Sequence, residues 1–275
     1  MGWLSRQFST RVIVLMPIAI AINIVLGYTV QSVLKLPIYL DSIGTILVGV
    51  LAGPLAGALT GVLSNVIWQY APGIGGGTIG PFAVTAGFIG LMAGLWGYLG
   101  VYKSRPATGT RLYAAVVVGV AVIALLAWRI YTSPLYGSDP SQGGFGTGVY
   151  TIIIAIGVIA AFGVGGFILV RRDAAGAYVA IAGALTGIVA AIVSAPIAAY
   201  LFEGVTGSGA DAIVAALRQG GQDVYNASLG QGLFSDPIDK TITSFVVFIV
   251  LTSLSTRIVA RFPLGERIAD AGAGA

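Results

Sequence analysis

Residues 177–202, AYVAIAGALTGIVAAIVSAPIAAYLF, form an apolar segment without a single charged side chain. About 20 consecutive apolar residues are enough for a helix to span the roughly 30 Å hydrocarbon core of a bilayer. Further apolar segments lie on both sides of it, at residues 10–29, 38–52, 54–70, 80–101, 112–132, 148–170 and 240–260. The sequence therefore predicts an all-α fold, a polytopic transmembrane helix bundle of about eight spans.

The overall composition agrees with a chain that folds in lipid. Hydrophobic residues make up 57% of it and charged residues only 9%, and the mean hydropathy is +0.95. The 41 glycines suit this class, because small residues let transmembrane helices approach closely. A transmembrane barrel would instead show short segments of alternating hydrophobicity, which are absent. We expect residues 1–275 to form a single integral membrane domain.

Several kinds of chemistry are excluded by missing residue types. The chain has no cysteine and no histidine, which removes disulfides, thiolate nucleophiles, histidine-bound metals and histidine proton relays. No dense carboxylate cluster suggests a metal site, so we expect no cofactor, no metal and no enzymatic activity. The net charge of +4 does not indicate nucleic-acid binding, because the basic residues lie at helix ends.

The orientation follows from the distribution of Lys and Arg, which favour cytoplasmic loops. With eight spans and a cytoplasmic N-terminus, ten of the fourteen basic residues fall inside: Arg6, Arg11, Lys103, Arg105, Arg111, Arg171, Arg172, Arg257, Arg261 and Arg267. The four others, Lys35, Arg129, Arg218 and Lys240, fall outside. The sequence thus predicts a multi-pass protein of the cell inner (plasma) membrane with both termini in the cytoplasm.

Gly53-Pro54 separates the second and third apolar segments, which are both short. They form either two tilted half-length helices or one broken hairpin. A stripe of glycines at every fourth position, Gly49, Gly53, Gly57 and Gly61, runs through this break. The stripe favours close contact with another helix. Packing inside the bundle is the preferred interpretation, and a groove for a partner membrane protein is the alternative.

Polar residues concentrate at the predicted outer face. Tyr39 and Asp41 precede the second span, where Asp41 is either part of a binding corner or a helix N-cap. Asn65, Trp68 and Gln69 end the third apolar segment. They are followed by a glycine-rich turn at 73–77, which suits a flap closing over a small ligand. Two further outer connections are expected at 133–147 and 204–235.

Carboxylates mark the outer ends of the last two spans. Glu203 follows the seventh span and either lines a pocket or is solvated. Residues 210–219 predict a short amphipathic surface helix capped by Asp211. Asp236, Asp239 and Lys240 precede or begin the last span. Three roles are open: a surface pair of Asp239 with Lys240, contact with a substrate, or a latch that holds a loop above a pocket.

Three segments carry a resemblance to a known family: LPIYLDSIGT at 36–45, LAGPLAGALTG at 51–61 and DPIDK at 236–240. Together they resemble the substrate-binding S component of energy-coupling factor (ECF) vitamin transporters. The resemblance implies a six-helix core over 10–101 and 177–262, with 112–170 as an inserted helix pair. It also implies capture of a vitamin-like molecule near the outer face, and partnership with a membrane T subunit driven by two cytoplasmic ATPases.

Site residues follow from this resemblance and from the polar outer positions. The candidate ligand-binding residues are Tyr39, Asp41, Asn65, Trp68, Gln69, Glu203, Asp236 and Asp239. The candidate contacts to a partner helix are Ala19, Gly49, Gly53, Gly57 and Gly61. The favoured function is uptake of a small water-soluble nutrient, and a non-transporting accessory subunit of a larger membrane complex is the alternative. The chain has no ATP-binding motif, so active transport requires another subunit.

Overall fold

The computed structural model describes residues 6–76, 78–131 and 147–268, and over these residues it forms helices and no strand. This confirms the all-α prediction. The helices are α2 (Thr10–Gly27), π-helix η1 (Tyr28–Val33), α3 (Ile43–Ala52), α4 (Pro54–Gln69), 3-10 helix η2 (Gly80–Phe82), α5 (Ala83–Tyr98), α6 (Gly109–Tyr131), α7 (Thr147–Arg171), α8 (Ala175–Phe202), α9 (Asp211–Gln219), α10 (Val224–Ser253), α11 (Thr256–Val259) and α12 (Gly265–Ile268). Gly77 and residues 133–146 of the expected outer turn and loop lie outside the described residues.

Three helical stretches of the described chain are long and apolar enough to cross a membrane: Thr10–Val33, Gly80–Tyr98 and Ala175–Phe202. Shorter apolar helices are α3 and the described parts of α6 and α7. The chain therefore has the helices of a membrane protein.

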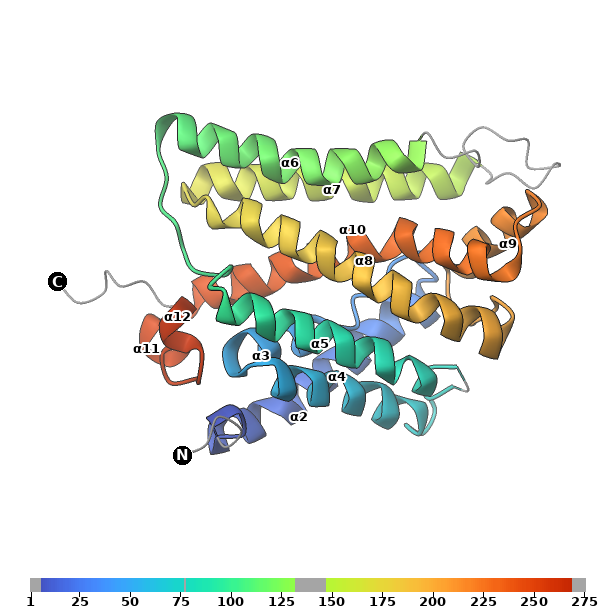
Figure 1. Cartoon of the computed structure of the whole chain (residues 1–275), viewed down its shortest axis with the longest axis horizontal. Coiled ribbons are helices and arrows are strands. Elements are labelled where there is room, and N and C mark those ends of the chain that lie inside the picture. The colour runs from blue at the N-terminus through green and yellow to red at the C-terminus, as the bar shows by residue number, and fades with distance from the viewer. Residues whose placement is uncertain (1–5, 77, 132–146, 269–275) are drawn as a thin grey trace.

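The helices run roughly along one axis (Figure 1). The pair α6 and α7 lies along one edge of the bundle, α8 and α10 lie next to it, and α2 to α5 complete the other side. The start of α2 meets the segment after α10, where Arg11 Nη1 donates a hydrogen bond to the carbonyl oxygen of Arg261 at 3.1 Å. Helix α9 lies at the opposite end of the molecule.

The break at Gly53-Pro54 is a reversal of the chain. Gly53 has φ +117°, a backbone conformation that glycine adopts far more readily than other residues, and Pro54 starts α4 immediately after it. A Cβ atom placed on Gly57 would lie 2.6 Å from the Cα atom of Gly49, so α4 folds back along α3. Of the two expected geometries, the structure has the hairpin.

The glycine stripe packs inside this hairpin and against α5. Gly49 and Gly57 both lie against the backbone of Gly90, and Gly61 lies against Ala86. The five residues expected to contact a partner helix are all buried by the chain's own side chains and backbone: Ala19, Gly49, Gly53, Gly57 and Gly61. Their placement corresponds to the internal-packing interpretation, and it offers no exposed surface to another protein.

The last long helix begins well before the expected residue 240. Asp223 is its N-cap and accepts a hydrogen bond from the backbone N–H of Asn226 at 3.0 Å, which lowers the pKa of Asp223 from its ordinary value. The helix then continues through Pro237 to Ser253. The charges at 236–240 therefore lie within the helix and not at its start, and their side chains are buried. Helix α9 matches the expected amphipathic helix, but Ala210 is its N-cap and Asp211 its first residue.

Asn23, in the middle of α2, ties three helices together. Its side-chain nitrogen donates to Thr45 Oγ1 at 2.8 Å and to Ser64 Oγ at 2.9 Å. Its side-chain oxygen accepts from the backbone N–H of Gly44 at 2.7 Å, at the start of α3. Both donors and the acceptor of this buried amide are satisfied, so it fixes α2 against α3 and α4 without an unpaired polar group.

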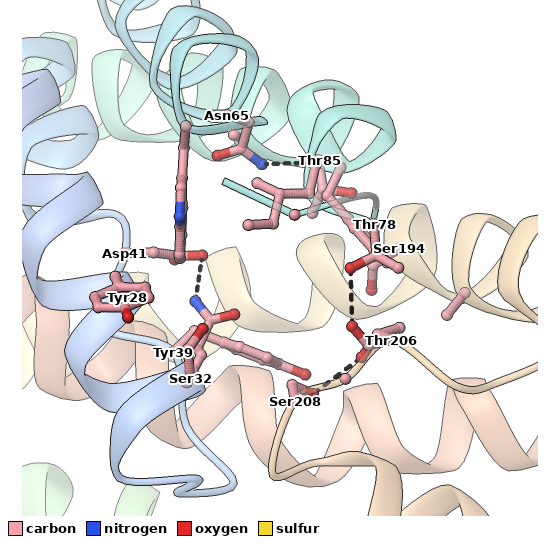
Figure 2. A pocket seen from close by; sticks show the side chains of 18 of the residues that line it. Tyr28, Ser32, Tyr39, Asp41, Asn65, Thr78, Thr85, Ser194, Thr206 and Ser208 are labelled. Atoms are coloured by element: carbon pink, nitrogen blue, oxygen red, sulfur yellow. Dashed lines mark hydrogen bonds between the residues drawn. The ribbon is translucent and has the colours of Figure 1, made fainter. Parts of the chain in front are cut away.

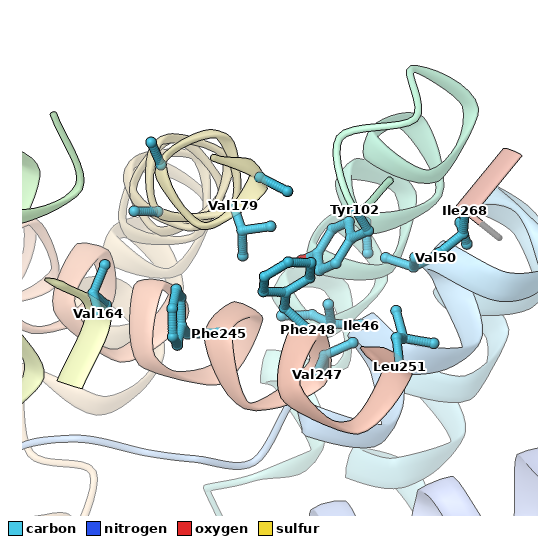
Figure 3. Close-up of a cluster of buried hydrophobic side chains, with 14 of the residues drawn as sticks. Ile46, Val50, Tyr102, Val164, Val179, Phe245, Val247, Phe248, Leu251 and Ile268 are labelled. Atoms are coloured by element: carbon cyan, nitrogen blue, oxygen red, sulfur yellow. The ribbon is translucent and has the colours of Figure 1, made fainter. Parts of the chain in front are cut away.

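An apolar core joins the α6–α7 pair to the rest of the bundle (Figure 3). Phe167 from α7 packs edge-on against Phe245 and Phe248 of α10, with ring centroids 5.2 and 5.6 Å apart. Tyr102, after α5, meets Phe248 at 6.5 Å. These aromatic contacts fix α10 on the C-terminal side of its charged segment at 236–240.

Candidate functional site

A cavity of about 350 Å³ lies at the end of the bundle that carries α9. Its walls come from η1, the segment before α3, the ends of α4 and α8, the start of α5 and the first half of α10. Residues 73–76, 78 and 79 of one connection and several residues of the connection at 204–208 border it as well. Figure 2 shows hydroxyl, amide, carboxyl and phenol groups from these elements around the space.

A buried ion cluster forms one side of the cavity. Lys240 Nζ forms salt bridges with Asp239 and with Asp41 Oδ1, the latter at 3.3 Å, and it donates to Ser42 Oγ at 2.9 Å. Asp41 also accepts from Gln31 Nε2 at 3.1 Å, a contact drawn in Figure 2. Buried charges need such pairing, because an isolated ion is costly to remove from water. The surface-pair interpretation of Asp239 and Lys240 is wrong, since both side chains are buried.

Asp239 lies behind the cavity wall and holds the segment before α3. Its Oδ1 atom accepts the backbone N–H groups of Tyr39 at 3.0 Å and Leu40 at 2.8 Å. This places Tyr39 in the wall, where its hydroxyl oxygen accepts from Gln231 Nε2 at 2.9 Å. Asp41 follows and is not an N-cap of α3, since the N-cap residue is Ser42.

Asp236, one turn before Lys240, is the carboxylate of the cavity that lacks a partner. It lines the cavity with 5% of its surface exposed, and it makes no hydrogen bond or salt bridge with any described residue. Thr85 and Ser228 also line the cavity, and their buried hydroxyl oxygens have no partner. Unpaired buried polar groups are rare in folded proteins, so the two hydroxyls, together with the Asp236 carboxylate that no described residue bonds, favour a polar ligand here.

Aromatic side chains supply the apolar part of the wall. Trp68 is 2% exposed and donates its Nε1–H to the carbonyl oxygen of Ile74 at 3.0 Å, which ties the glycine-rich turn to α4. Tyr28 and Phe82 also line the cavity, and Phe82 stacks on Phe202 with ring centroids 5.8 Å apart. Small-molecule sites combine aromatic faces with polar groups that fix the orientation of the ligand.

Asn65 and Gln69, one turn apart on α4, have different surroundings. Asn65 lines the cavity and donates to the carbonyl oxygen of Ile79 at 3.4 Å. Gln69 lies outside the cavity wall, where its side-chain oxygen accepts the backbone N–H of Gly80 at 2.7 Å. Gln69 therefore orders the start of η2, whereas Asn65 keeps its side-chain oxygen available to a ligand.

Two connections meet at the rim. Thr78 Oγ1 donates to the carbonyl oxygen of Thr206 at 2.8 Å, as Figure 2 shows. Asp211 accepts the backbone N–H groups of Thr206 at 3.0 Å and Gly207 at 2.6 Å, so the second connection is fixed by α9. Lys35 Nζ reaches the same connection, donating to the Gly207 carbonyl oxygen at 2.7 Å.

The structure brings together five of the eight predicted site residues in the cavity wall: Tyr39, Asp41, Asn65, Trp68 and Asp236. The other three lie elsewhere. Gln69 and Asp239 hold backbone segments, and Glu203 is exposed at the left-handed end of α8 with φ +52°. Glu203 thus fits the solvated alternative.

The sequence interpretation missed most of the polar wall: Tyr28, Gln31, Ser32, Thr78, Thr85, Ser194, Thr206, Ser208, Ser228 and Gln231. Single hydroxyl residues in apolar helices carry no distinguishing pattern, because they also bond to their own helix. The sequence does contain a signal for Ser228 and Gln231. Asp223 is a residue type that favours helix N-caps, and a helix that begins there includes both residues.

No group of three or more potential metal ligands comes together within the part of the chain that the structure describes. No family model, no curated protein and no solved structure matches this chain. Its function is therefore inferred from the cavity and the arrangement of the helices.

Proposed function

We propose that this protein captures a small water-soluble nutrient from the outer face of the membrane and takes part in its uptake. The observation that carries the proposal is the polar cavity of about 350 Å³ at one end of an otherwise apolar bundle. Its combination of aromatic walls, unpaired Asp236 and unpaired hydroxyls suits a compact ligand with both a flat face and polar groups.

In the proposed topology the chain crosses the plasma membrane eight times. Both termini lie in the cytoplasm. Basic side chains support it: Arg11 lies against Arg261, and Arg267 Nη1 donates to the Tyr98 carbonyl oxygen, all at the end away from the cavity. Arg105 contacts the backbone beside Lys103 at that end too. Cytoplasmic ends of membrane proteins are enriched in Lys and Arg, so the cavity faces outward in this topology.

The proposed place of the chain is that of an S component in an ECF-type transporter. Two segments that carry the resemblance converge on the cavity: LPIYLDSIGT supplies Tyr39, Asp41 and Ser42, and DPIDK supplies Asp236 and Lys240. The T subunit and the cytoplasmic ATPases would supply the energy for release. The proposal does not place the T-subunit contact on Ala19 or the glycine stripe, because these residues are buried.

The experiment is native mass spectrometry of the protein purified gently from its own cells, followed by binding measurements with the carried molecule. We expect a retained small molecule, submicromolar affinity, and weaker binding in Asn65→Ala and Trp68→Ala. Tyr200→Ala is the matched control, because Tyr200 is an exposed aromatic residue outside the cavity wall, stacked on Tyr225. Unchanged affinity in both cavity variants would show that the ligand binds elsewhere.

The same purification separates uptake from the accessory-subunit alternative. Co-purification with a membrane subunit and two ATPases supports the ECF-type role. An empty cavity together with co-purification of a different membrane complex would refute nutrient capture in favour of the accessory role.

A further inference from the structure

The charges around the cavity are unbalanced. Asp41, Asp211 and Asp236 line it together with Lys240, and Asp239 lies directly behind the wall. Four carboxylates thus stand against two ammonium groups around the cavity, Lys240 in the wall and Lys35 at the rim, where Lys35 Nζ donates to the Gly207 carbonyl oxygen. Lys240 is already shared between Asp41 and Asp239, so it offers no free positive charge to an anionic ligand. Complementarity favours a ligand that brings a positive charge.

Asp236 differs from the other three carboxylates in having no donor. Asp41 accepts from Gln31, Ser42 and Lys240, and Asp211 accepts from two backbone N–H groups. Asp236 is 95% buried by the protein, since 5% of its surface is exposed, and it borders the cavity. A buried carboxylate without a partner is costly to keep, whereas a cation delivered by the ligand would satisfy it.

Aromatic rings surround the same space. Tyr28, Tyr39, Trp68 and Phe82 all line the cavity. Aromatic faces attract cations as well as flat rings, by about 0.5–2 kcal/mol for a cation near a ring face. A planar group with its positive charge delocalised over nitrogen would therefore meet both kinds of surface.

We infer that the ligand carries a planar, positively charged nitrogen group, of the amidinium or aminopyridinium kind, and that Asp236 pairs with it. This inference rests on the proposed function, because it names the class of molecule that the same cavity captures. Asn65, Thr85 and Ser228 then supply the remaining hydrogen bonds to the polar edge of the ligand.

The test uses three probes of nearly equal shape and different charge: benzamidine, benzamide and benzoate. Each is titrated onto the full chain in lipid nanodiscs, and binding is measured by saturation-transfer NMR. We expect benzamidine to bind at least about tenfold more tightly than benzamide, because a charge-assisted hydrogen bond is worth more than a neutral one. Benzoate should bind most weakly. Equal affinities, tighter binding of benzoate, or no binding of benzamidine would overturn the inference.

Asp236→Asn keeps the shape of the side chain and removes its charge. We expect it to bring the ratio of benzamidine affinity to benzamide affinity to about one. Glu203→Gln is the matched control, since this acid is exposed at the same end of the molecule but outside the cavity wall. The wild-type ratio tests the inference even if Asp236→Asn fails to fold. A carried natural molecule that is anionic would refute the inference and leave nutrient capture standing, whereas an empty cavity in the native preparation would refute nutrient capture itself.

Discussion

The carboxylate of Asp239 lies 2.8 Å from the backbone nitrogen of Leu40, a residue 199 positions earlier in the chain. Leu40 has φ +51°, a left-handed conformation that is uncommon for a residue other than glycine. Such strain persists where surrounding contacts over-determine the backbone. Here the charge on α10 supplies those contacts, and it thereby sets Tyr39 and Asp41 in the cavity wall.

Replacing Asp239 with Asn tests this relationship. The amide is nearly the same size but removes one charge from the buried cluster, which leaves Lys240 with Asp41 alone. We expect the free energy of unfolding to fall by about 3 kcal/mol, because the buried Lys240 loses one of its two charged partners and removing a partner from a buried ion pair is strongly destabilising. Reversible unfolding in mixed micelles measures the change.

Glu203→Gln serves as the control, since the exposed carboxylate of Glu203 makes no salt bridge among the described residues. It should leave the unfolding free energy unchanged. Wild-type stability in Asp239→Asn would mean that the cluster does not organise the segment before α3.

Gly57→Ala tests the close approach of α3, α4 and α5. The added methyl group would lie 2.6 Å from the Cα atom of Gly49 and 2.7 Å from the carbonyl oxygen of Gly90. Backbone atoms cannot move away as a flexible side chain can, so we expect a loss of about 2 kcal/mol in the free energy of unfolding. The same micelle titration detects it.

Gly166→Ala on α7 is the matched substitution without a clash, because nothing lies within 4 Å of its added methyl group. Alanine is the better helix former by roughly 0.5–1 kcal/mol, so this variant should be slightly more stable than the wild type. Equal effects at positions 57 and 166 would contradict the packing argument.

Thr78→Val tests the hydrogen bond that joins the two connections at the rim. Valine keeps the shape of threonine and removes the hydroxyl that donates to the Thr206 carbonyl oxygen. Without this hydrogen bond, we expect the carried ligand to dissociate faster by about fivefold, the equivalent of roughly 1 kcal/mol for one hydrogen bond. Stopped-flow displacement from nanodiscs measures the rate.

The control for this measurement is Thr252→Val, at the far end of α10, where the hydroxyl only bonds to carbonyl oxygens of its own helix. Its dissociation rate should equal that of the wild type. A slower or unchanged rate in Thr78→Val would show that the rim hydrogen bond does not retain the ligand.

The helical fold was predictable because uninterrupted apolar runs such as 177–202 carry a strong signal for a helix in lipid. The end of the chain was less predictable. Charges at Asp236, Asp239 and Lys240 suggest the boundary of a membrane span, yet they lie within α10, which starts at Val224. The pairing of Lys240 with Asp41 depends on a residue 199 positions away, and no local pattern encodes such a partner.

Part of the cavity wall was predictable from the local sequence. Tyr39, Asn65 and Trp68 stood out as polar or aromatic groups at the ends of apolar segments. The hydroxyls of Thr85 and Ser194 did not stand out. They line the cavity only because of how α5 and α8 pack against the other helices, and the local sequence does not show this. Gln69 was predicted to touch a ligand because it shares the local environment of Asn65, but the start of η2 takes up its side chain.

The proposed orientation can be tested by labelling single cysteines, because the chain has no cysteine of its own and any label on it reports the introduced thiol. Gln222→Cys places a thiol at an exposed position between α9 and α10, and Ser255→Cys places one at an exposed position after α10. These positions lie at opposite ends of α10. In intact cells, a membrane-impermeant maleimide should label Gln222→Cys and leave Ser255→Cys unlabelled, and permeabilised cells should show both labelled. The reverse pattern would turn the cavity toward the cytoplasm and contradict capture from outside, whereas labelling of both in intact cells would show that α10 does not separate two compartments.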